Sequence, residues 1–187
     1  MLGGFVAAVF LGTALGFAIA LNGTAARVCD PILNFLRPIP PVAWVPLAIV
    51  WFGIGNAPAF FLTFVAAFFP IVLNAAEGVR AIPEQHFQVA ACLQASPQMV
   101  FRRVIWPGAL PQLFTGYRVG FGIAWMAVVA AEMIAARSGL GHLIQVSQDV
   151  LRTDLVVAGM ATIGVIGIGC DWGLRRLARR AMPWENA

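Results

Sequence analysis

The stretch QVAACLQASPQMVFRRVIWPGALP, from Gln88 to Pro111, separates two apolar halves of the chain. It combines helix-forming alanines with glutamine and arginine side chains, and it is too polar to resemble the segments on either side. The fold therefore depends on what a polar, helix-forming island does between two long apolar regions.

The composition places those apolar regions in a membrane. Of the 187 residues, 60% are hydrophobic and only 11% are charged, which lies outside the usual range of soluble domains. Three scattered cysteines, Cys29, Cys92 and Cys170, indicate neither a disulfide framework nor a clustered metal site. We expect them to be small buried hydrophobic side chains.

All twelve basic residues are arginine, and the chain has no lysine. A phosphate-binding loop needs its lysine, and a Schiff-base enzyme needs its amine. The apolar segments also hold no paired carboxylates and no clustered histidines, which argues against an intramembrane enzyme. We therefore predict no catalytic residue, no metal and no cofactor on this chain; ATP and Mg²⁺, if used, are bound by a partner.

Hydropathy predicts about five transmembrane helices in an all-α chain. The predicted spans are residues 3–21, 38–55, 58–76, 112–135 and 155–174. A cleavable signal peptide is the alternative for the first, but a basic segment before it is missing. Residues 38–55 and 58–76, separated by GIGNAP, are expected to form a tight helical hairpin.

Arginines in the connections predict the orientation, because they accumulate on the cytoplasmic side. With these spans, one side carries Arg27, Arg37, Arg80, Arg102, Arg103, Arg175, Arg176, Arg179 and Arg180, and the other carries Arg137 and Arg152. The loop at 77–107 and the tail at 175–187 are therefore predicted to be cytoplasmic. Alternation of arginine by loop is a topology signal, so we expect no nucleic acid as a partner.

The island itself predicts two short helices outside the bilayer. The first is expected from Pro83 to about Ala95; Ser96 is a good N-cap and Pro97 a good first residue for the second. Pro107 and Gly108 are expected to end that second helix near Ile105. The small and amide side chains of the island suit a helix that binds in a partner's groove. The alternative is a helix pair that rests on anionic lipid headgroups.

The island resembles the cytoplasmic loop of binding-protein-dependent ABC transporter permeases. On the spacing of their signature, Gln88, Val89 and Ala90 occupy an initial Glu-Ala-Ala triplet, Gln94 a glycine, and Pro107 the final proline. The flanking segments LRPIPPVAWVPLAIVWFGIG, FFPIVLNAAEGV and RTDLVVAGM are similar to the nitrate, sulfonate, taurine and bicarbonate branch of that superfamily. The similarity extends from about residue 5 to Trp184.

This resemblance implies a type I permease fold, with residues 1–187 as a single transmembrane domain in a bacterial inner membrane. It implies ATPase coupling through the island, by the residues Gln88, Val89, Ala90, Ala91, Gln94, Ser96, Pro97 and Pro107. The implied partners are ATP-binding cassette ATPases, an extracytoplasmic binding protein, a second permease copy and membrane lipid. Members of this branch carry a further helix before the first span, so the alternative is a truncated or inactive remnant that acts as a membrane scaffold.

Ionisable side chains within the spans are expected to face protein or water rather than lipid. Arg118 and Asp171 fall at similar depths on antiparallel spans, so we predict that they form a structural pair. Glu132 either lines the outer mouth or holds the RSGLG turn, with Arg137 or Arg152 as its basic neighbours. The substrate implied by the resemblance is a small anion, and Trp44, Asn74 and Trp125, with Glu132, are the predicted pathway residues.

Overall fold

The computed structural model describes residues 2–135 and 138–183, and every regular element in this part of the chain is helical. The elements are α1 (Leu2–Leu21), α2 (Gly23–Leu36), the 3-10 turn η1 (Pro41–Trp44), α3 (Val45–Phe52), α4 (Asn56–Arg80), α5 (Glu84–Cys92), α6 (Pro97–Val100), the π turn η2 (Phe101–Ile105), α7 (Trp106–Ala135), α8 (Leu140–Asp149) and α9 (Thr153–Ala181). The predicted all-α fold is confirmed.

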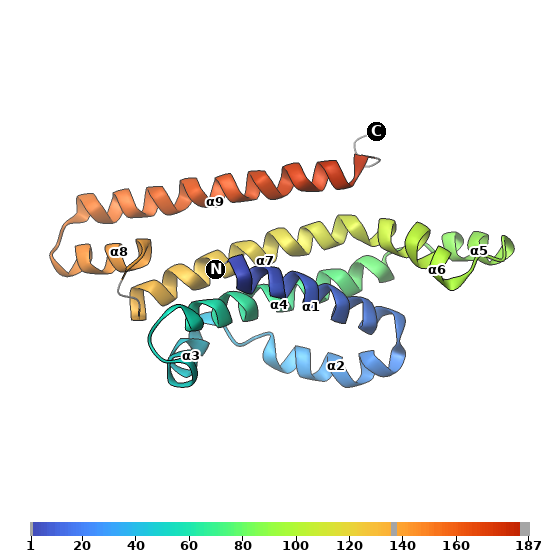
Figure 1. The fold of residues 1–187 in the computed structure, drawn as a ribbon, viewed down its shortest axis with the longest axis horizontal. Helices are drawn as coiled ribbons and strands as arrows, with labels where there is room; N and C mark the ends of the chain where they lie inside the picture. The colour runs from blue at the N-terminus through green and yellow to red at the C-terminus, as the bar shows by residue number, and fades with distance from the viewer. Residues whose placement is uncertain (1, 136–137, 184–187) are drawn as a thin grey trace.

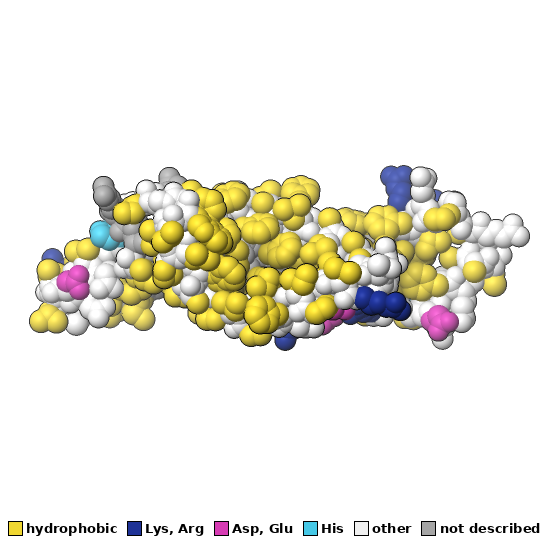
Figure 2. Space-filling model, turned by 90° about the horizontal axis from the view of Figure 1, so that it is seen from below, with side chains coloured by type: hydrophobic (Ala, Val, Ile, Leu, Met, Phe, Trp, Pro, Cys, Tyr) yellow, Lys and Arg dark blue, Asp and Glu magenta, His cyan; other side chains and the backbone are white. Residues whose placement is uncertain are grey.

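Within the described residues, four helical segments are long and apolar enough to cross a membrane: Leu2–Leu21, Ala57–Arg80, Pro97–Ile134 and Thr153–Ala181. They lie roughly along one axis, with α5 and α6 at one end, which we call the loop end, and α3 and α8 at the opposite end (Figure 1). Figure 2 shows a hydrophobic middle on the face that carries α2 and α3, with charged side chains gathered mainly toward the ends.

The predicted continuous span at residues 38–55 is wrong. Its place is taken by two helices, Gly23–Leu36 and Pro41–Phe52, which together resemble one span bent by 87°. Prolines explain the bend, because Pro38 and Pro40 have no backbone N–H and Pro40 adopts an extended backbone. The connection between the first two predicted spans, residues 22–37, thus contains the first helix of the bent pair, and the candidate spans number five only if that pair counts as one.

Small residues bring α1, α4 and α7 into close contact. Gly12 of α1 lies against Ile71 of α4, and Gly120 of α7 lies against Ala67 and Ile71. Along α1 the successive α4 neighbours run in the same direction, so α1 and α4 are parallel, whereas α7 is antiparallel to both. The small-xxx-small spacings therefore build seams within this chain.

The polar island forms two helices, as predicted, but the second does not end at Pro107. The Ser96 side chain caps α6 by accepting the Met99 amide at 3.4 Å, and Pro97 is the first helical residue. The chain then continues through η2 into α7, because the Trp106 amide bonds to the Phe101 carbonyl five residues back. This wider π turn carries the helix past Pro107, which has no N–H to contribute.

α9 stands apart from the three-helix core, with only 6% of its apolar window buried. Arg118 of α7 donates from Nε to Asp171 Oδ1 at 2.8 Å, and Arg175 donates from Nε to Asp171 Oδ2 at 2.7 Å. The structure thus contains the predicted Arg118–Asp171 pair, extended by a second arginine one turn further along α9. This cluster ties α9 to α7 beside Cys170 and Leu174, which pack against the buried cluster that contains Phe121 and Ala124 of α7.

We expect a methyl group added at the helix seam to destabilise the bundle. A Cβ at Gly16 would lie against the Val72 carbonyl and the Ala75 side chain at less than 3 Å, whereas a Cβ at Gly164 meets nothing within 4 Å. Overpacking of this kind costs about 1–3 kcal/mol. Gly16→Ala should therefore lower the thermal aggregation midpoint in detergent by several degrees, and Gly164→Ala should not; equal midpoints would contradict the seam.

Arg118→Ala and Asp171→Ala should each loosen α9, at a cost of about 1–2 kcal/mol because the pair is partly exposed. The exchanged pair Arg118→Asp with Asp171→Arg should restore the midpoint only when Arg175→Gln is also present, because Arg175 would otherwise face a like charge. Thermal midpoints and protease resistance of the α8–α9 region measure this. If the triple variant stays as unstable as the single ones, the cluster is not a structural tie.

Candidate functional site

A hollow with a volume of about 380 Å³ lies between α5 and α6. We call it the loop groove, and its lining is Gln85, His86, Val89, Ala90, Leu93, Ala95, Met99, Val100, Arg103 and Val104. Val89, Leu93 and Met99 are 59%, 75% and 48% exposed. Large apolar side chains gathered around a hollow, on a segment that projects from the bundle, are typical of a surface that contacts another protein.

The turn between α5 and α6 shapes the groove. The Ala95 amide bonds to the Ala90 carbonyl at 3.0 Å, and the Gln94 amide bonds to the Ala91 carbonyl at 2.9 Å. These two bonds are the Schellman arrangement, which requires a left-handed residue after the helix. Gln94 takes that conformation with φ 50°, so a glycine would adopt it without the strain that a side chain brings.

The eight predicted coupling residues fall into four places. Val89 and Ala90 line the loop groove, whereas Gln88 and Ala91 are exposed beside it. Gln94 and Ser96 lie in the α5–α6 turn, and Pro97 is the first residue of α6. Pro107, in the first turn of α7, lines a second hollow of about 260 Å³ with Pro83 and Arg103.

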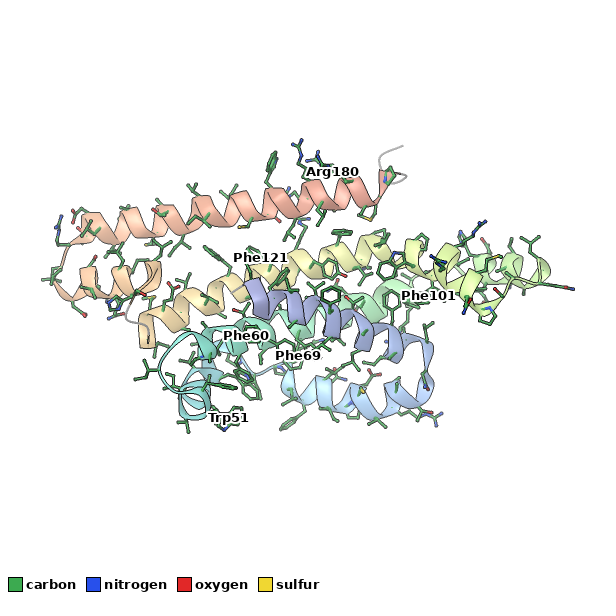
Figure 3. All side chains as sticks on the ribbon, viewed as in Figure 1. Trp51, Phe60, Phe69, Phe101, Phe121 and Arg180 are labelled. Carbon is green, nitrogen blue, oxygen red and sulfur yellow. The ribbon has the colours of Figure 1, made fainter. Side chains whose placement is uncertain are left out.

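Aromatic contacts fasten the island to the membrane helices. Phe101 of η2 packs against Phe17 of α1 with ring centroids 5.7 Å apart, and Trp106 stacks on the same Phe17 at 5.8 Å. Figure 3 places Phe101 at the loop end of the bundle. Phe87 and Ile82 pack against the buried cluster that contains Phe17, so a displacement of the island would be transmitted directly to α1 and α7.

The four predicted pathway residues are not gathered into one site. Trp44 packs edge-on against Phe61 at 6.3 Å. The Asn74 side chain donates to the Pro70 carbonyl at 2.9 Å and contacts the Gly116 seam. Trp125 stacks on Phe121 at 6.3 Å. The indole nitrogens of both tryptophans are buried without a hydrogen-bond partner among the described residues.

Glu132 holds the turn that leads into α8. Its Oε2 accepts the Gly141 amide at 2.9 Å, near the N-terminus of that helix, where a carboxylate is favoured. Of its two predicted basic neighbours, Arg152 pairs instead with Asp154 at 2.8 Å, and Arg137 lies outside the described residues. Of the two roles considered for Glu132, this contact fits the turn.

The sequence analysis missed Leu93 and Met99, which supply much of the exposed apolar surface of the loop groove. A signal was present, because both are large apolar residues on an island that is otherwise polar. Among the residues that the structure describes, no three His, Cys, Asp or Glu side chains lie close enough to share a metal ion. The described residues offer a contact surface in the loop groove and close seams between the helices.

Comparison with known proteins gives this arrangement a context. The chain is 43% identical over 180 residues to the taurine transport system permease protein TauC of Escherichia coli K12, a match that covers 96% of this chain and 66% of that protein. It is 33% identical over 183 residues to the nitrate import permease protein NrtB of Synechocystis, covering 98% and 66%. The bicarbonate transport system permease protein CmpB of Synechococcus elongatus is 38% identical over 170 residues, covering 90% and 61%. The chain thus spans about two thirds of the length of these relatives.

The fold has solved counterparts as well. A chain of an inward-facing structure of the MetNI methionine ABC transporter superposes with a TM-score of 0.70 at 20% identity, covering 95% of this chain and 93% of that one. The family model described as the binding-protein-dependent transport system inner membrane component matches residues 8–182. Fold, sequence and family model agree: the chain belongs to the binding-protein-dependent transport system inner membrane components.

Proposed function

We propose that the chain is the membrane-spanning permease subunit of an ATP-driven importer and that it passes a small anion inward from a binding protein. The observation that carries this proposal is the loop groove, an exposed apolar hollow on a two-helix projection that is fastened by aromatic packing to α1 and α7. The chain catalyses no reaction in this proposal. ATP and Mg²⁺ are bound and used by the partner ATPase.

The ATPase contacts the loop groove, and the island moves with it. Apolar side chains on α5 and α6 supply the contact area, and Arg103 at the edge supplies charge. Because Phe101 and Trp106 both pack on Phe17, a change in the position of the island displaces α1 and α7 together. ATP binding can shift the conformation only through a difference in ATPase affinity between the two states.

In this proposal the loop end faces the cytoplasm. After the correction of the second crossing, eight arginines lie at or near the loop end: Arg27, Arg80, Arg102, Arg103, Arg175, Arg176, Arg179 and Arg180. The opposite end carries Arg152 among the described residues. The imbalance still favours cytoplasmic placement of residues 77–107 and of the tail from 175 onward.

The importer contains two permease copies, ATP-binding cassette ATPases and an extracytoplasmic binding protein in an inner membrane. The exposed apolar side chains of α9 require a cover of lipid or of the second copy, because a span of this kind is not stable in water. The substrate is a sulfonate, taurine, nitrate or bicarbonate type of anion, supported by the transport names of the similar permeases. The choice among these anions rests largely with the binding protein.

A charge placed in the loop groove should prevent ATPase association. Leu93→Glu or Val89→Glu buries a carboxylate against the partner without a counter-charge, which costs several kcal/mol at an interface. Gln98→Glu is the matched control, because Gln98 is exposed on the same island but does not line the groove. Co-purification from membranes measures the result. A normal permease-to-ATPase ratio for Leu93→Glu would rule out the groove as the contact.

Removal of the aromatic link should uncouple ATP hydrolysis from transport. We expect Phe101→Ala to leave the ATPase bound but to lower anion uptake per ATP hydrolysed by several-fold, because Phe17 loses one of its two ring contacts. Phe10→Ala is the control, since Phe10 is 72% exposed on α1 and outside this cluster. An unchanged uptake-to-hydrolysis ratio in proteoliposomes would contradict the link.

A further inference from the structure

The polar side of α2 is the feature that neither the fold nor the proposed coupling uses. Because α1 and α4 are parallel, the chain must return from the loop end to the opposite end between them, and α2 with α3 makes that return. α2 begins two residues after α1 ends and rises about 21 Å over its 14 residues. Figure 1 shows α2 alongside α1 and ending about midway along α4.

Four polar residues occupy one side of α2. Arg27, Asp30, Asn34 and Arg37 fall within about 80° of one another around the helix axis; Asp30 is half-buried and the other three are exposed. Leu33 lies about 40° beyond Arg37 around the axis and packs in the cluster with Ile19, Val72 and Ala76, so the polar side borders the packed side. We call Arg27, Asp30, Asn34 and Arg37 the α2 polar stripe.

The stripe holds two arginines and one aspartate, and that aspartate pairs outside the stripe. Asp30, the one acidic residue of α2, lies 3.9 Å from Arg80 of α4. Neither Arg27 nor Arg37 has an ion-pair partner among residues 2–135 and 138–183. Of the two, Arg37 has the charge that is more costly to place in a membrane. It follows the end of α2, which lies well inside the span and away from the loop-end surface.

The backbone at the same point also lacks partners. The carbonyls of Asn34 and Phe35 would bond to amides four residues on, but Pro38 has no amide hydrogen and the Ile39 amide bonds to Leu36 at 3.1 Å. Pro38 and Pro40 are exposed on the chain. Non-helical backbone at membrane depth is tolerated only against protein or in a water-filled cavity.

We infer that the α2 polar stripe lines the water-filled anion route, and that Arg37, at the α2–α3 break, binds the small oxyanion during passage. This inference rests on the proposed importer function and names residues for its route. A cationic guanidinium with free donors suits a single sulfonate, nitrate or bicarbonate group. Asn34, one turn away, supplies a neutral amide, and Arg27 lies further toward the loop end along the same side.

Thiol labelling tests the stripe without any need for transport. The parent has Cys29, Cys92 and Cys170 replaced by serine, and single cysteines are placed at Asn34→Cys and, as the control, Ile32→Cys. Ile32 is 54% exposed but lies about 160° away around the helix, on the apolar side. Membranes are treated with the anionic sulfonatoethyl methanethiosulfonate or the cationic trimethylammonioethyl methanethiosulfonate.

Asn34→Cys should react with the anionic reagent about tenfold faster than Ile32→Cys, because a wet, positively charged surface concentrates anions. Adding Arg37→Gln to Asn34→Cys should lower the ratio of anionic to cationic rates by about fivefold, the effect of one nearby charge at intermediate dielectric. Arg37→Lys should retain the ratio. Equal amounts of inserted protein on gels show that each variant folds into the membrane.

Two results would overturn the inference: Asn34→Cys as slow as Ile32→Cys, or a rate ratio that Arg37→Gln leaves unchanged. Both are separable from a failure of the importer proposal. Normal labelling in a chain that binds no ATPase would leave the stripe standing and remove the importer. Normal assembly and uptake with an unlabelled stripe would do the reverse.

Discussion

The close approach of α1 and α4 along a row of small residues sets the rest of the structure. Gly12 and Gly16 let the α1 backbone reach α4 within van der Waals contact, and the order of these contacts shows that the two helices run in the same direction. Parallel neighbours cannot be joined by a short loop, so the chain must cross the bilayer between them. α2, the proline break and α3 make that crossing, and they carry polar groups into the membrane interior because no continuous helix is formed there.

The same seam explains why the island is a rigid extension rather than a flexible loop. α4 and α7 meet along Gly78, Gly116 and Gly120, and they leave the bundle together at the loop end. Ile82 fills the space beside Gly108, where α4 ends and the island returns toward α7. The island therefore has a fixed position relative to the seam. In the proposed function, this is what converts movement of a partner into movement of helices rather than of a loop alone.

The sequence predicted those features that depend on local chemistry or on overall hydrophobicity. Ser96 and Pro97 start a helix wherever they are placed, and a 20-residue apolar segment such as α1 requires no tertiary information. The depth of Arg118 and Asp171 was also accessible, because two spans of known direction fix the relative height of their side chains. The branch of the permease superfamily was recognisable from segments spread along the chain, a pattern confirmed by the similar proteins.

The features that the sequence predicted wrongly depend on proline breaks, on one-sided polarity and on the hydrogen-bond register, none of which enters a mean hydropathy over a window. Residues 38–55 are apolar enough for a span, but prolines divide them, and the bilayer crossing begins at Gly23, where the sequence is polar on one side only. An amphipathic period was present in Arg27, Asp30, Asn34 and Arg37, yet it is hidden by averaging over a whole window. Pro107 was expected to end a helix, but the preceding π turn changed the hydrogen-bond register before the proline was reached.

The arginines that lie at membrane depth differ in whether a nearby carboxylate neutralises their charge. Arg118 has Asp171 at 2.8 Å, so its charge is neutralised locally and its role can be structural, holding α9 against α7. Arg37 has no such partner among the described residues and stands beside carbonyls that also lack hydrogen bonds. A charge without a counter-charge is stable at that depth only if water or an anion reaches it. The contrast between two arginines on one chain therefore assigns one to the scaffold and the other to the route.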